Sequence, residues 1–170
     1  MLRTALSVCG LILLGTLSRL LPHLPNMTAL GAVALKSGAR FGVWGIAIPL
    51  TSMLISDLVI GFYNWRLLIS VYASFVLVTL LGRYAEKHPS ARISINAVSG
   101  SLIFFFITNM VVWATSTWYP YTLSGLLTCY VVALPFLAPM IVGDILFSLL
   151  LLKKPIRFPL QKQMRLTAEV

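Results

Sequence analysis

The sequence predicts an all-α fold, a polytopic membrane protein built as a bundle of about six transmembrane helices with a short second helix and both termini in the cytoplasm. Its 170 residues are 59% hydrophobic and only 10% charged, with a mean hydropathy of +0.94. A chain with so few polar residues cannot cover the surface of a water-soluble globule of this size. The long apolar runs and the uneven distribution of Lys and Arg indicate the same class, with a single integral membrane domain over residues 1–170.

The apolar runs locate the membrane spans, because a helix needs about 20 apolar residues to cross about 30 Å of hydrocarbon. Five spans are expected at residues 5–21, 43–61, 67–82, 93–115 and 123–152. A sixth apolar segment, residues 27–38, would cover only about 18 Å as a straight helix. This segment is therefore a short helix, a helix extended by its flanks, or a re-entrant element. Asn26 or Thr28 is well placed to cap its first turn.

The basic residues indicate the orientation, because cytoplasmic loops of membrane proteins are enriched in Lys and Arg. With six crossings and a cytoplasmic N-terminus, Arg19 and Arg66 lie outside. Eleven basic residues then lie inside: Arg3, Lys36, Arg40, Arg83, Lys87, Arg92, Lys153, Lys154, Arg157, Lys162 and Arg165. Five crossings with an external N-terminus also place eleven inside, with Arg19 in place of Arg3. Both topologies give a cytoplasmic C-terminus with a basic tail at 153–170, and we expect a multi-pass protein of the bacterial cytoplasmic (inner) membrane.

The formal charge of +9 does not indicate nucleic-acid binding, because the basic residues are dispersed over membrane-flanking loops and a short tail. Anchoring to the anionic inner leaflet of the lipid bilayer explains Lys153, Lys154 and Arg157 more simply. The sequence also has no Gly-rich phosphate loop, His-Glu-x-x-His motif, usable pair of carboxylates or Ser nucleophile elbow. We therefore expect no enzyme activity, metal or cofactor, and we interpret Cys9 and Cys129 as small buried thiols.

The three loops expected on the outer side are aromatic, rich in amides and nearly free of charge. They contain seven of ten candidate substrate-binding residues: His23, Asn26, Asn64, Trp65, Trp118, Tyr119 and Tyr121. Aromatic rings with a few directed hydrogen-bonding groups suit a pocket for a flat or amphipathic small molecule. For any single ring, the aromatic belt at the membrane interface is the commoner role. Asn109 and Trp113 share one helix face, as either a pocket floor or an interhelical packing contact.

Ionisable residues inside a span are costly and are therefore candidates for function. Asp57, the tenth candidate, lies near the outer end of its span, and Arg19 lies near the outer end of the first span. If these helices touch, the two residues form a structural ion pair, with a ligand contact as the alternative. Asp144 lies closer to the cytoplasm, where Arg40 or Lys36 could neutralise it, and we expect a structural role there.

Several short motifs together resemble a family of small bacterial inner-membrane proteins of uncharacterised function. The resemblance covers most of the chain and rests on Arg19-Leu-Leu-Pro-His-Leu-Pro-Asn-Met-Thr-Ala29, Ile48-Pro-Leu50, Ser56-Asp57, Thr108-Asn109, Trp113, Tyr119-Pro120, Gly125-Leu-Leu-Thr-Cys-Tyr130, Pro135-Phe136 and Gly143-Asp144. In size and topology that family is similar to the S components of energy-coupling-factor (ECF) vitamin transporters, which are their substrate-binding subunits.

The resemblance implies a six-helix bundle whose outward loops close over a vitamin or similar micronutrient for uptake into the cell. It also implies an energy-coupling transmembrane subunit with ATPases as a partner, although some S-component-like proteins, including a cobalamin-uptake group, work alone. The first span departs from the coupled type, because Ala5 and Cys9 are its nearest match to an Ala-x-x-x-Ala docking pattern. The alternative function is a non-transporting membrane assembly or structural protein that acts through helix–helix contacts.

Overall fold

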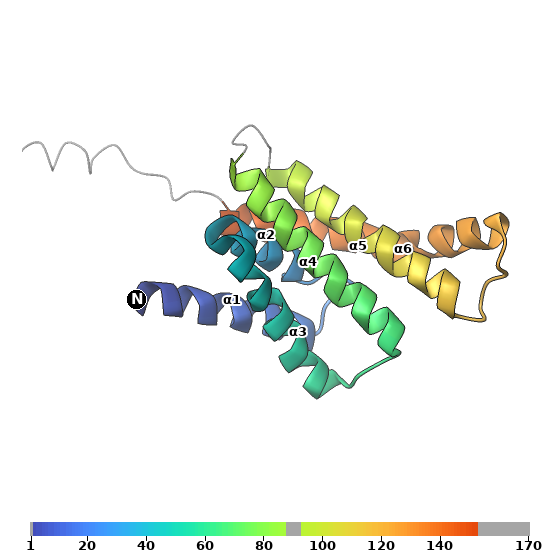
Figure 1. The fold of residues 1–170 in the computed structure, drawn as a ribbon, viewed down its shortest axis with the longest axis horizontal. Coiled ribbons are helices and arrows are strands. Elements are labelled where there is room, and N and C mark those ends of the chain that lie inside the picture. The colour runs from blue at the N-terminus through green and yellow to red at the C-terminus, as the bar shows by residue number, and fades with distance from the viewer. Residues whose placement is uncertain (1, 88–92, 153–170) are drawn as a thin grey trace, which may run out of the picture.

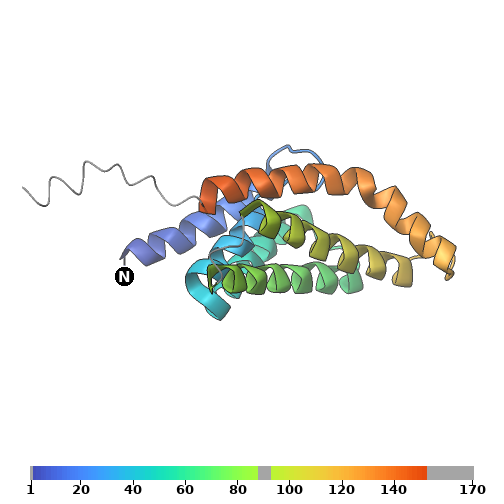
Figure 2. The same ribbon diagram turned by 90° about the horizontal axis from the view of Figure 1, so that it is seen from above.

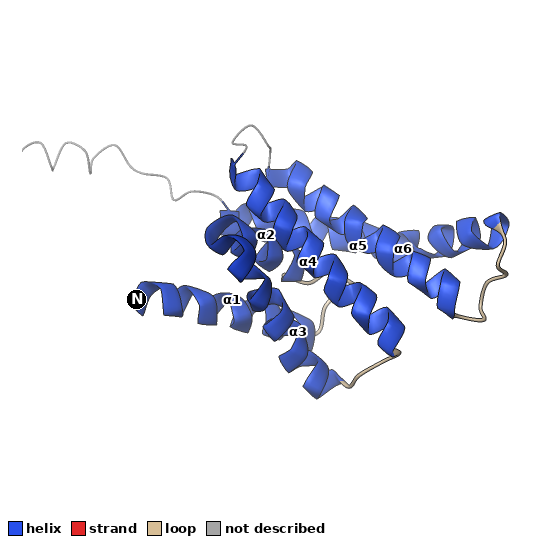
Figure 3. Cartoon of the chain, in the orientation of Figure 1, coloured by secondary structure: helices blue, strands red, loops and turns tan. Residues whose placement is uncertain are grey.

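Helices make up the regular structure of residues 2–87 and 93–152, the part of the chain that the computed structural model describes (Figure 1, Figure 3). In that part the elements follow in the order α1 (Leu2–Leu20), α2 (Leu30–Phe41), the 3₁₀ helix η1 (Gly42–Ile46), α3 (Ala47–Ile60), α4 (Trp65–Lys87), α5 (Ile93–Thr115) and α6 (Leu123–Leu152). The expected all-α class is confirmed. Arg92 and the expected basic tail at 153–170 lie outside the described residues.

Among the described residues, five helical stretches are long and apolar enough to cross a membrane: Leu2–Leu20, Leu30–Ile60, Trp65–Glu86, Ile93–Thr115 and Leu123–Leu152. The second stretch is not one straight helix, because η1 separates α2 from α3. At this junction Gly42 has a φ of +61°, a conformation that favours glycine. Gly45 packs so closely on α2 that a Cβ there would overlap the carbonyl group of Ser37. These two glycines allow the chain to turn back between α2 and α3.

The short helix α2 lies in the centre of the bundle and contacts each of the other five α-helices. Those five surround it in the order α1, α3, α4, α5 and α6, in which each helix contacts the next. The backbones of α2 and α4 are so close that a Cβ at Gly38 would overlap the carbonyl group of Thr79. Likewise, a Cβ at Gly82 would overlap the carbonyl group of Leu35. Small residues therefore place α2 in the core, as is typical of helix contacts in membrane proteins.

Two clusters of buried apolar side chains hold α2 against its neighbours. The larger cluster joins α2 to α3, α4 and α5 through Leu30, Ala34, Leu35, Met53, Phe75, Val78 and Ala97. The smaller cluster joins α2 and the residue before it to α1 and α3 through Leu11, Ala29, Val33 and Ile48. Many Leu, Val and Ile side chains on the outward faces of the helices are exposed, as lipid-facing surfaces require.

The two cysteines differ in their surroundings. Cys129 is buried, as expected, whereas Cys9 is exposed on α1. The expectation of a buried thiol is therefore wrong for Cys9. The reason is that α1 buries only one narrow face, formed by Leu11, Gly15 and Thr16.

The cap expected for the short helix is also wrong. No side chain caps α2 from its own N-cap residue, Ala29, and Asn26 instead adopts a φ of +61° within a turn. The backbone N–H of Ala29 donates to Ser18 Oγ, at 3.1 Å. The sequence signal failed because the cap comes from α1, eleven residues earlier in the chain, and such a tertiary contact has no local pattern.

The two ends of the bundle carry different kinds of residue, and Figure 1 shows how the segments at these ends are arranged. The end that we call the basic end holds the N-terminus of α1, the turn from α2 to α3, and the C-terminus of α4. Its described basic residues are Arg3, Lys36, Arg40 and Arg83. The opposite end, which we call the aromatic end, consists of the connections 21–29, 61–64 and 116–122. These three connections correspond to the three aromatic and amide-rich loops that the sequence predicts on the outer side.

Candidate functional site

A cavity of about 430 Å³ lies in the half of the bundle next to the aromatic end, and all six α-helices contribute to its lining. Its polar lining residues are Arg19, His23, Asn26, Thr28, Tyr63, Thr108 and Asn109. Its apolar lining is rich in aromatic rings and Met, with Met53, Phe75, Phe104, Phe105, Phe136 and Met140. A volume within the range of about 300–1,000 Å³ and a mixed lining are typical of small-molecule sites.

Helical periodicity brings these residues to the cavity, because side chains three and four positions apart share one helix face. On α4 the lining residues are Leu67, Val71 and Phe75, and on α5 they include Phe105, Thr108, Asn109 and Val112. On α6 they are Ala133, Phe136, Leu137 and Met140. Pro135 and Pro139 interrupt this part of α6, and Figure 2 shows that the helix is bent. Each proline removes a backbone donor and clashes with the preceding turn, so the bend has a local cause.

The wall of the cavity on α5 combines aromatic rings with a polar amide. The rings of Phe75 and Phe104 pack with their centroids 5.4 Å apart, and Phe105 packs against Tyr130 at 5.5 Å. The Asn109 side chain donates one hydrogen bond through Nδ2 to the carbonyl oxygen of Phe105, at 2.8 Å. Since an amide has a second N–H and an acceptor oxygen, Asn109 retains hydrogen-bonding capacity for a molecule in the cavity.

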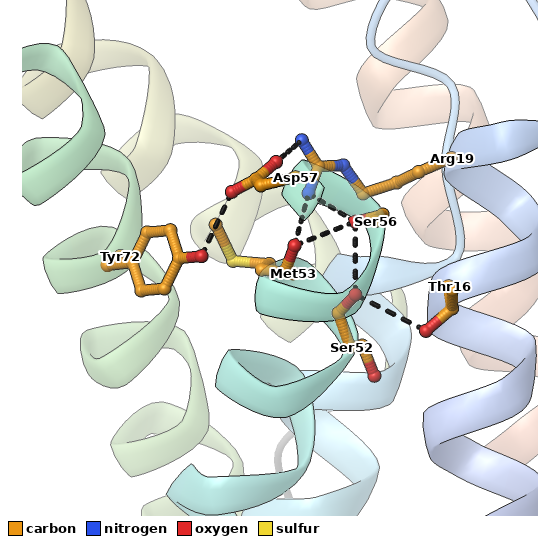
Figure 4. A network of polar contacts seen from close by, with 7 residues as sticks. All are labelled: Thr16, Arg19, Ser52, Met53, Ser56, Asp57 and Tyr72. Carbon is orange, nitrogen blue, oxygen red and sulfur yellow. Dashed lines mark hydrogen bonds and ion pairs between the residues drawn. The ribbon is translucent and has the colours of Figure 1, made fainter. Parts of the chain in front are cut away.

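Arg19, which lines the cavity, forms an ion pair between α1 and α3, and Figure 4 shows this pair with its hydrogen-bonding neighbours. Arg19 Nη2 lies 2.7 Å from Asp57 Oδ1, which confirms the ion pair expected if these helices touch. Arg19 Nη1 also donates to Ser56 Oγ at 2.6 Å and to the Met53 carbonyl at 3.3 Å. The second carboxylate oxygen of Asp57 accepts a hydrogen bond of 2.9 Å from the Tyr72 hydroxyl group. The network therefore links α1, α3 and α4, and its charges neutralise each other.

Close packing of α1 on α3 brings Arg19 to this position. Ser52 and Ser56 are four residues apart on the face of α3 that meets α1. Thr16 Oγ1 donates to the Ser52 carbonyl at 3.2 Å, and Ser52 Oγ lies 3.2 Å from the Ile12 carbonyl. A Cβ added at Gly15 would lie 2.7 Å from Ser52 Oγ. Short polar side chains and one glycine thus allow the two helices to approach closely enough for the ion pair.

Tyr63, in the connection between α3 and α4, lies beside the same charges. Burial raises the pKa of its phenol above the usual value, and the negative charge of Asp57 raises this pKa further, while Arg19 opposes both. Tyr63 therefore remains a neutral hydrogen-bonding group at the cavity at physiological pH.

Three of the ten candidate residues from the sequence line the cavity: His23, Asn26 and Asn109. Asp57 does not line it, because its carboxylate is buried behind Arg19, which does. His23 Nδ1 lies 2.6 Å from the Leu21 carbonyl, and this contact orients the exposed ring.

The other six candidates lie outside the cavity lining. Asn64 Oδ1 accepts a hydrogen bond of 2.9 Å from the Arg66 N–H at the start of α4, and the Trp65 ring packs against the Arg66 guanidinium. Trp113 Nε1 donates to the Pro120 carbonyl at 3.0 Å, and its ring meets the Tyr121 ring edge to face. Trp118 and Tyr121 are exposed, and Tyr119 is partly buried beside them.

Comparison with known proteins gives a family but no activity. The model of a family of unknown function, DUF6580, matches residues 1–157. The chain belongs to the DUF6580 family. No curated protein and no solved structure matches it. These comparisons do not support the similarity to ECF S components.

The DUF6580 chain has a second buried carboxylate, Asp144, deeper in the bundle. Ser101 Oγ on α5 lies 2.6 Å from Asp144 Oδ2, and a Cβ at Gly31 on α2 would overlap the carboxylate. Neither Lys36 nor Arg40, the two partners considered from the sequence, forms an ion pair with Asp144; in the described residues the ion pair is Arg19 with Asp57. The first turn of α2 faces Asp144, whereas Lys36 and Arg40 follow in the second half of this helix.

Sequence reasoning missed most of the apolar lining of this DUF6580 cavity. Phe75 is an example, and its signal was the four-residue spacing of Leu67, Val71 and Phe75 along α4. Phe136 was hidden in a uniformly apolar span. Nothing in such a span distinguishes a ring that faces a cavity from one that faces lipid, as the exposed Phe106 illustrates.

Proposed function

We propose that this DUF6580 protein binds a small amphipathic molecule, a vitamin or similar micronutrient, in the cavity and serves its uptake across the bacterial cytoplasmic membrane. The observation that carries the proposal is the amphipathic cavity of about 430 Å³ to which all six α-helices contribute. Close-packed protein interiors leave few hollows of this size, and a concave, mixed polar and apolar hollow is the usual form of a small-molecule site. The proposed role is binding and transport, without chemistry on the ligand.

The charges around the cavity favour a ligand without a large net charge. Arg19 is already neutralised by Asp57, so it offers no free positive charge to an anion. Asn109, Thr28 and Tyr63 offer neutral hydrogen-bonding groups, and the rings of Phe75 and Phe104 offer flat apolar area. A ring-bearing molecule with polar groups on one edge suits this combination.

We propose six crossings with both termini in the cytoplasm, which places the aromatic end and the cavity on the outer side. Two observations support this topology. The described basic residues Arg3, Lys36, Arg40 and Arg83 gather at one end, as the positive-inside rule requires of a cytoplasmic end. The chain also turns back between α2 and α3, so that the Leu30–Ile60 stretch counts as two crossings, the first of them short.

The energy source is proposed to be external to the 170 residues, since they contain no phosphate-binding loop. We propose two alternatives: the protein works with an energy-coupling transmembrane subunit and its ATPases, or it works as a solitary protein. A role as a membrane assembly protein is the second candidate function. The exposed pair Ala5 and Cys9 on α1 favours it, because small residues four apart permit close contact with a partner helix.

The test is to purify the protein from native membranes in mild detergent and to identify co-purifying small molecules by mass spectrometry. We expect one organic molecule at near-stoichiometric amount in the wild type. Asn109→Ala should bind the molecule about 5- to 150-fold more weakly and should therefore co-purify with less of it, because a lost hydrogen bond in a buried site costs about 1–3 kcal/mol. Asn96→Ala is the matched control, since Asn96 lies on the same helix but outside the cavity lining.

Equal retention by the two Asn variants would show that the molecule does not bind in this cavity. A stoichiometric partner protein without any bound small molecule would favour the assembly role instead.

A further inference from the structure

Asp144 lies directly below the floor of the cavity, and the same three helices form both sites. Three of the lining residues, Met140 on α6, Phe105 on α5 and Leu30 on α2, form the part of the cavity that we call its floor. One helical turn below them lie Asp144, four residues after Met140, and Ser101, four residues before Phe105. Gly31, the residue after Leu30, provides the space for the carboxylate on α2. The floor of the cavity and the surroundings of Asp144 are therefore neighbouring turns of the same three helices.

The hydrogen-bonding groups around Asp144 accommodate a protonated carboxyl group. Ser101 Oγ lies 2.6 Å from Asp144 Oδ2 and 3.1 Å from the Ala97 carbonyl, but a hydroxyl group has a single proton to donate. If Asp144 carries a proton, its O–H donates to Ser101 Oγ while the Ser101 O–H donates to Ala97. Both contacts are then satisfied. Ser148, one turn further along α6, is also fully buried, and its Oγ has no hydrogen-bond partner in the described structure.

No opposite charge in the described structure replaces such a proton. The helices that contact α6 are α2 and α5, and α5 has no charged residue between Ile93 and Thr115. On α2 the charged residues are Lys36 and Arg40, and Lys36 follows Gly31 by about 8 Å along the helix. The connection 21–29, whose Met27 packs on Gly143, contains His23, which is exposed. On α6 itself, Cys129 and Tyr130 are more than three turns away. A carboxylate that is 3% exposed without a counter-charge inside a membrane is expensive.

We propose that Asp144 binds a proton beneath the cavity, and that this proton and the occupant of the cavity affect each other's binding. The proton comes from water and returns to water, and only the carboxyl O–H bond forms and breaks. The coupling, unlike the proton site itself, rests on the proposed function. Binding in the cavity is then linked to proton binding, because an occupied cavity excludes water above the acid and favours its neutral form.

Infrared difference spectroscopy of the full chain in lipid bilayers tests the proton site without any ligand. At about pH 6, well above the ordinary Asp pKa of about 3.9, the wild type should still show the C=O band of a protonated carboxylic acid. Asp144→Asn, which has nearly the same shape, should lose this band completely. Ser101→Ala should keep the band but shift its frequency, because the acid loses its hydrogen-bond partner.

An unchanged band in Asp144→Asn would overturn the assignment. A band that disappears when Na⁺ replaces K⁺ at constant pH would also overturn it, because the site would then bind a metal cation. The infrared experiment needs no ligand, so its outcome does not depend on whether a co-purifying molecule is found. The proton site and the proposed function can therefore be refuted independently.

The coupling is tested by filling the cavity floor. Met140→Phe enlarges a side chain that is 6% exposed and lines the cavity. Val142→Phe, the control, enlarges a side chain that is 51% exposed and does not line the cavity. In Met140→Phe the pH at which half of the band is lost should rise by about one unit, a tenfold increase in proton affinity, with no shift in Val142→Phe. Equal half-loss pH values in both variants and the wild type would overturn the coupling.

Discussion

Removal of the negative charge of Asp57 should destabilise the bundle more than any single polar change at its surface. In Asp57→Asn the Arg19 guanidinium, 16% exposed, keeps its charge but loses its carboxylate partner, which is 1% exposed. Leaving one member of a buried ion pair without its partner costs about 3–5 kcal/mol. The Tyr72 hydroxyl group still finds an acceptor in the Asn side chain, so its hydrogen bond adds little to this loss. We expect a decrease of about 3–4 kcal/mol in the free energy of unfolding, near the lower limit because Arg19 reaches the cavity.

The assay is reversible unfolding of the purified protein in mixed micelles by increasing amounts of denaturing detergent, followed by circular dichroism. The double variant Arg19→Met with Asp57→Leu removes both charges and should lose only about 1–2 kcal/mol, chiefly from the Tyr72 hydroxyl group that is left without its acceptor, since the Ser56 hydroxyl still donates to backbone carbonyl groups of α3. Glu86→Gln, at an exposed carboxylate, is the control and should change stability by less than about 0.5 kcal/mol. If Asp57→Asn behaves like Glu86→Gln, or if the double variant is less stable than Asp57→Asn, the ion pair does not hold these helices together as described.

Three further predictions concern the packing and the loops. Gly31→Ala should destabilise by about 1–3 kcal/mol, because its Cβ would overlap Asp144, whereas Gly10→Ala, with nothing within 4 Å, should be neutral or stabilising in the same unfolding assay. Trp113→Phe should lower the free energy of unfolding by about 1 kcal/mol, because it removes the hydrogen bond to the Pro120 carbonyl. The variant should still retain any co-purifying molecule, and loss of that molecule would mean that the binding site extends to Trp113. The pKa of Tyr63 is raised in the folded state. The contribution of Tyr63 to the free energy of unfolding should therefore be fully present below about pH 10 and should be lost as the pH rises above it. Tyr63→Phe should reduce this alkaline fall in unfolding titrations, and an identical pH profile in the variant would contradict the raised pKa.

The membrane class and the helices could be predicted because hydropathy and helix length are local properties of the sequence. The expected spans at 93–115 and 123–152 match the bounds of α5 and α6. The pairing of Arg19 with Asp57 was also foreseeable, since two opposite charges at the same depth in a membrane have few other partners. The central position of α2 was harder to predict, because it depends on backbone contacts at Gly38 and Gly82 with residues far along the chain.

The cavity was the least predictable feature. Trp and Tyr serve both in ligand pockets and in interfacial belts, so the sequence drew attention to loop residues such as Trp118, which is 79% exposed. The apolar lining comes instead from Phe and Met within spans, where every neighbour is apolar as well. Asp144 was visible as an intramembrane acid, but its neighbours Ser101 and Gly31 are uncharged and distant in sequence. A search for basic partners therefore could not find them.

The central claim, that the cavity holds a small molecule, is tested most directly by filling the cavity. Ala133 lines it, whereas Ala138, five residues later on α6, is exposed and lies outside the cavity lining. Mass spectrometry should find the co-purifying molecule in the wild type and in Ala138→Trp, and should find none in a folded Ala133→Trp. Equal amounts of the molecule in the two Trp variants would contradict the claim.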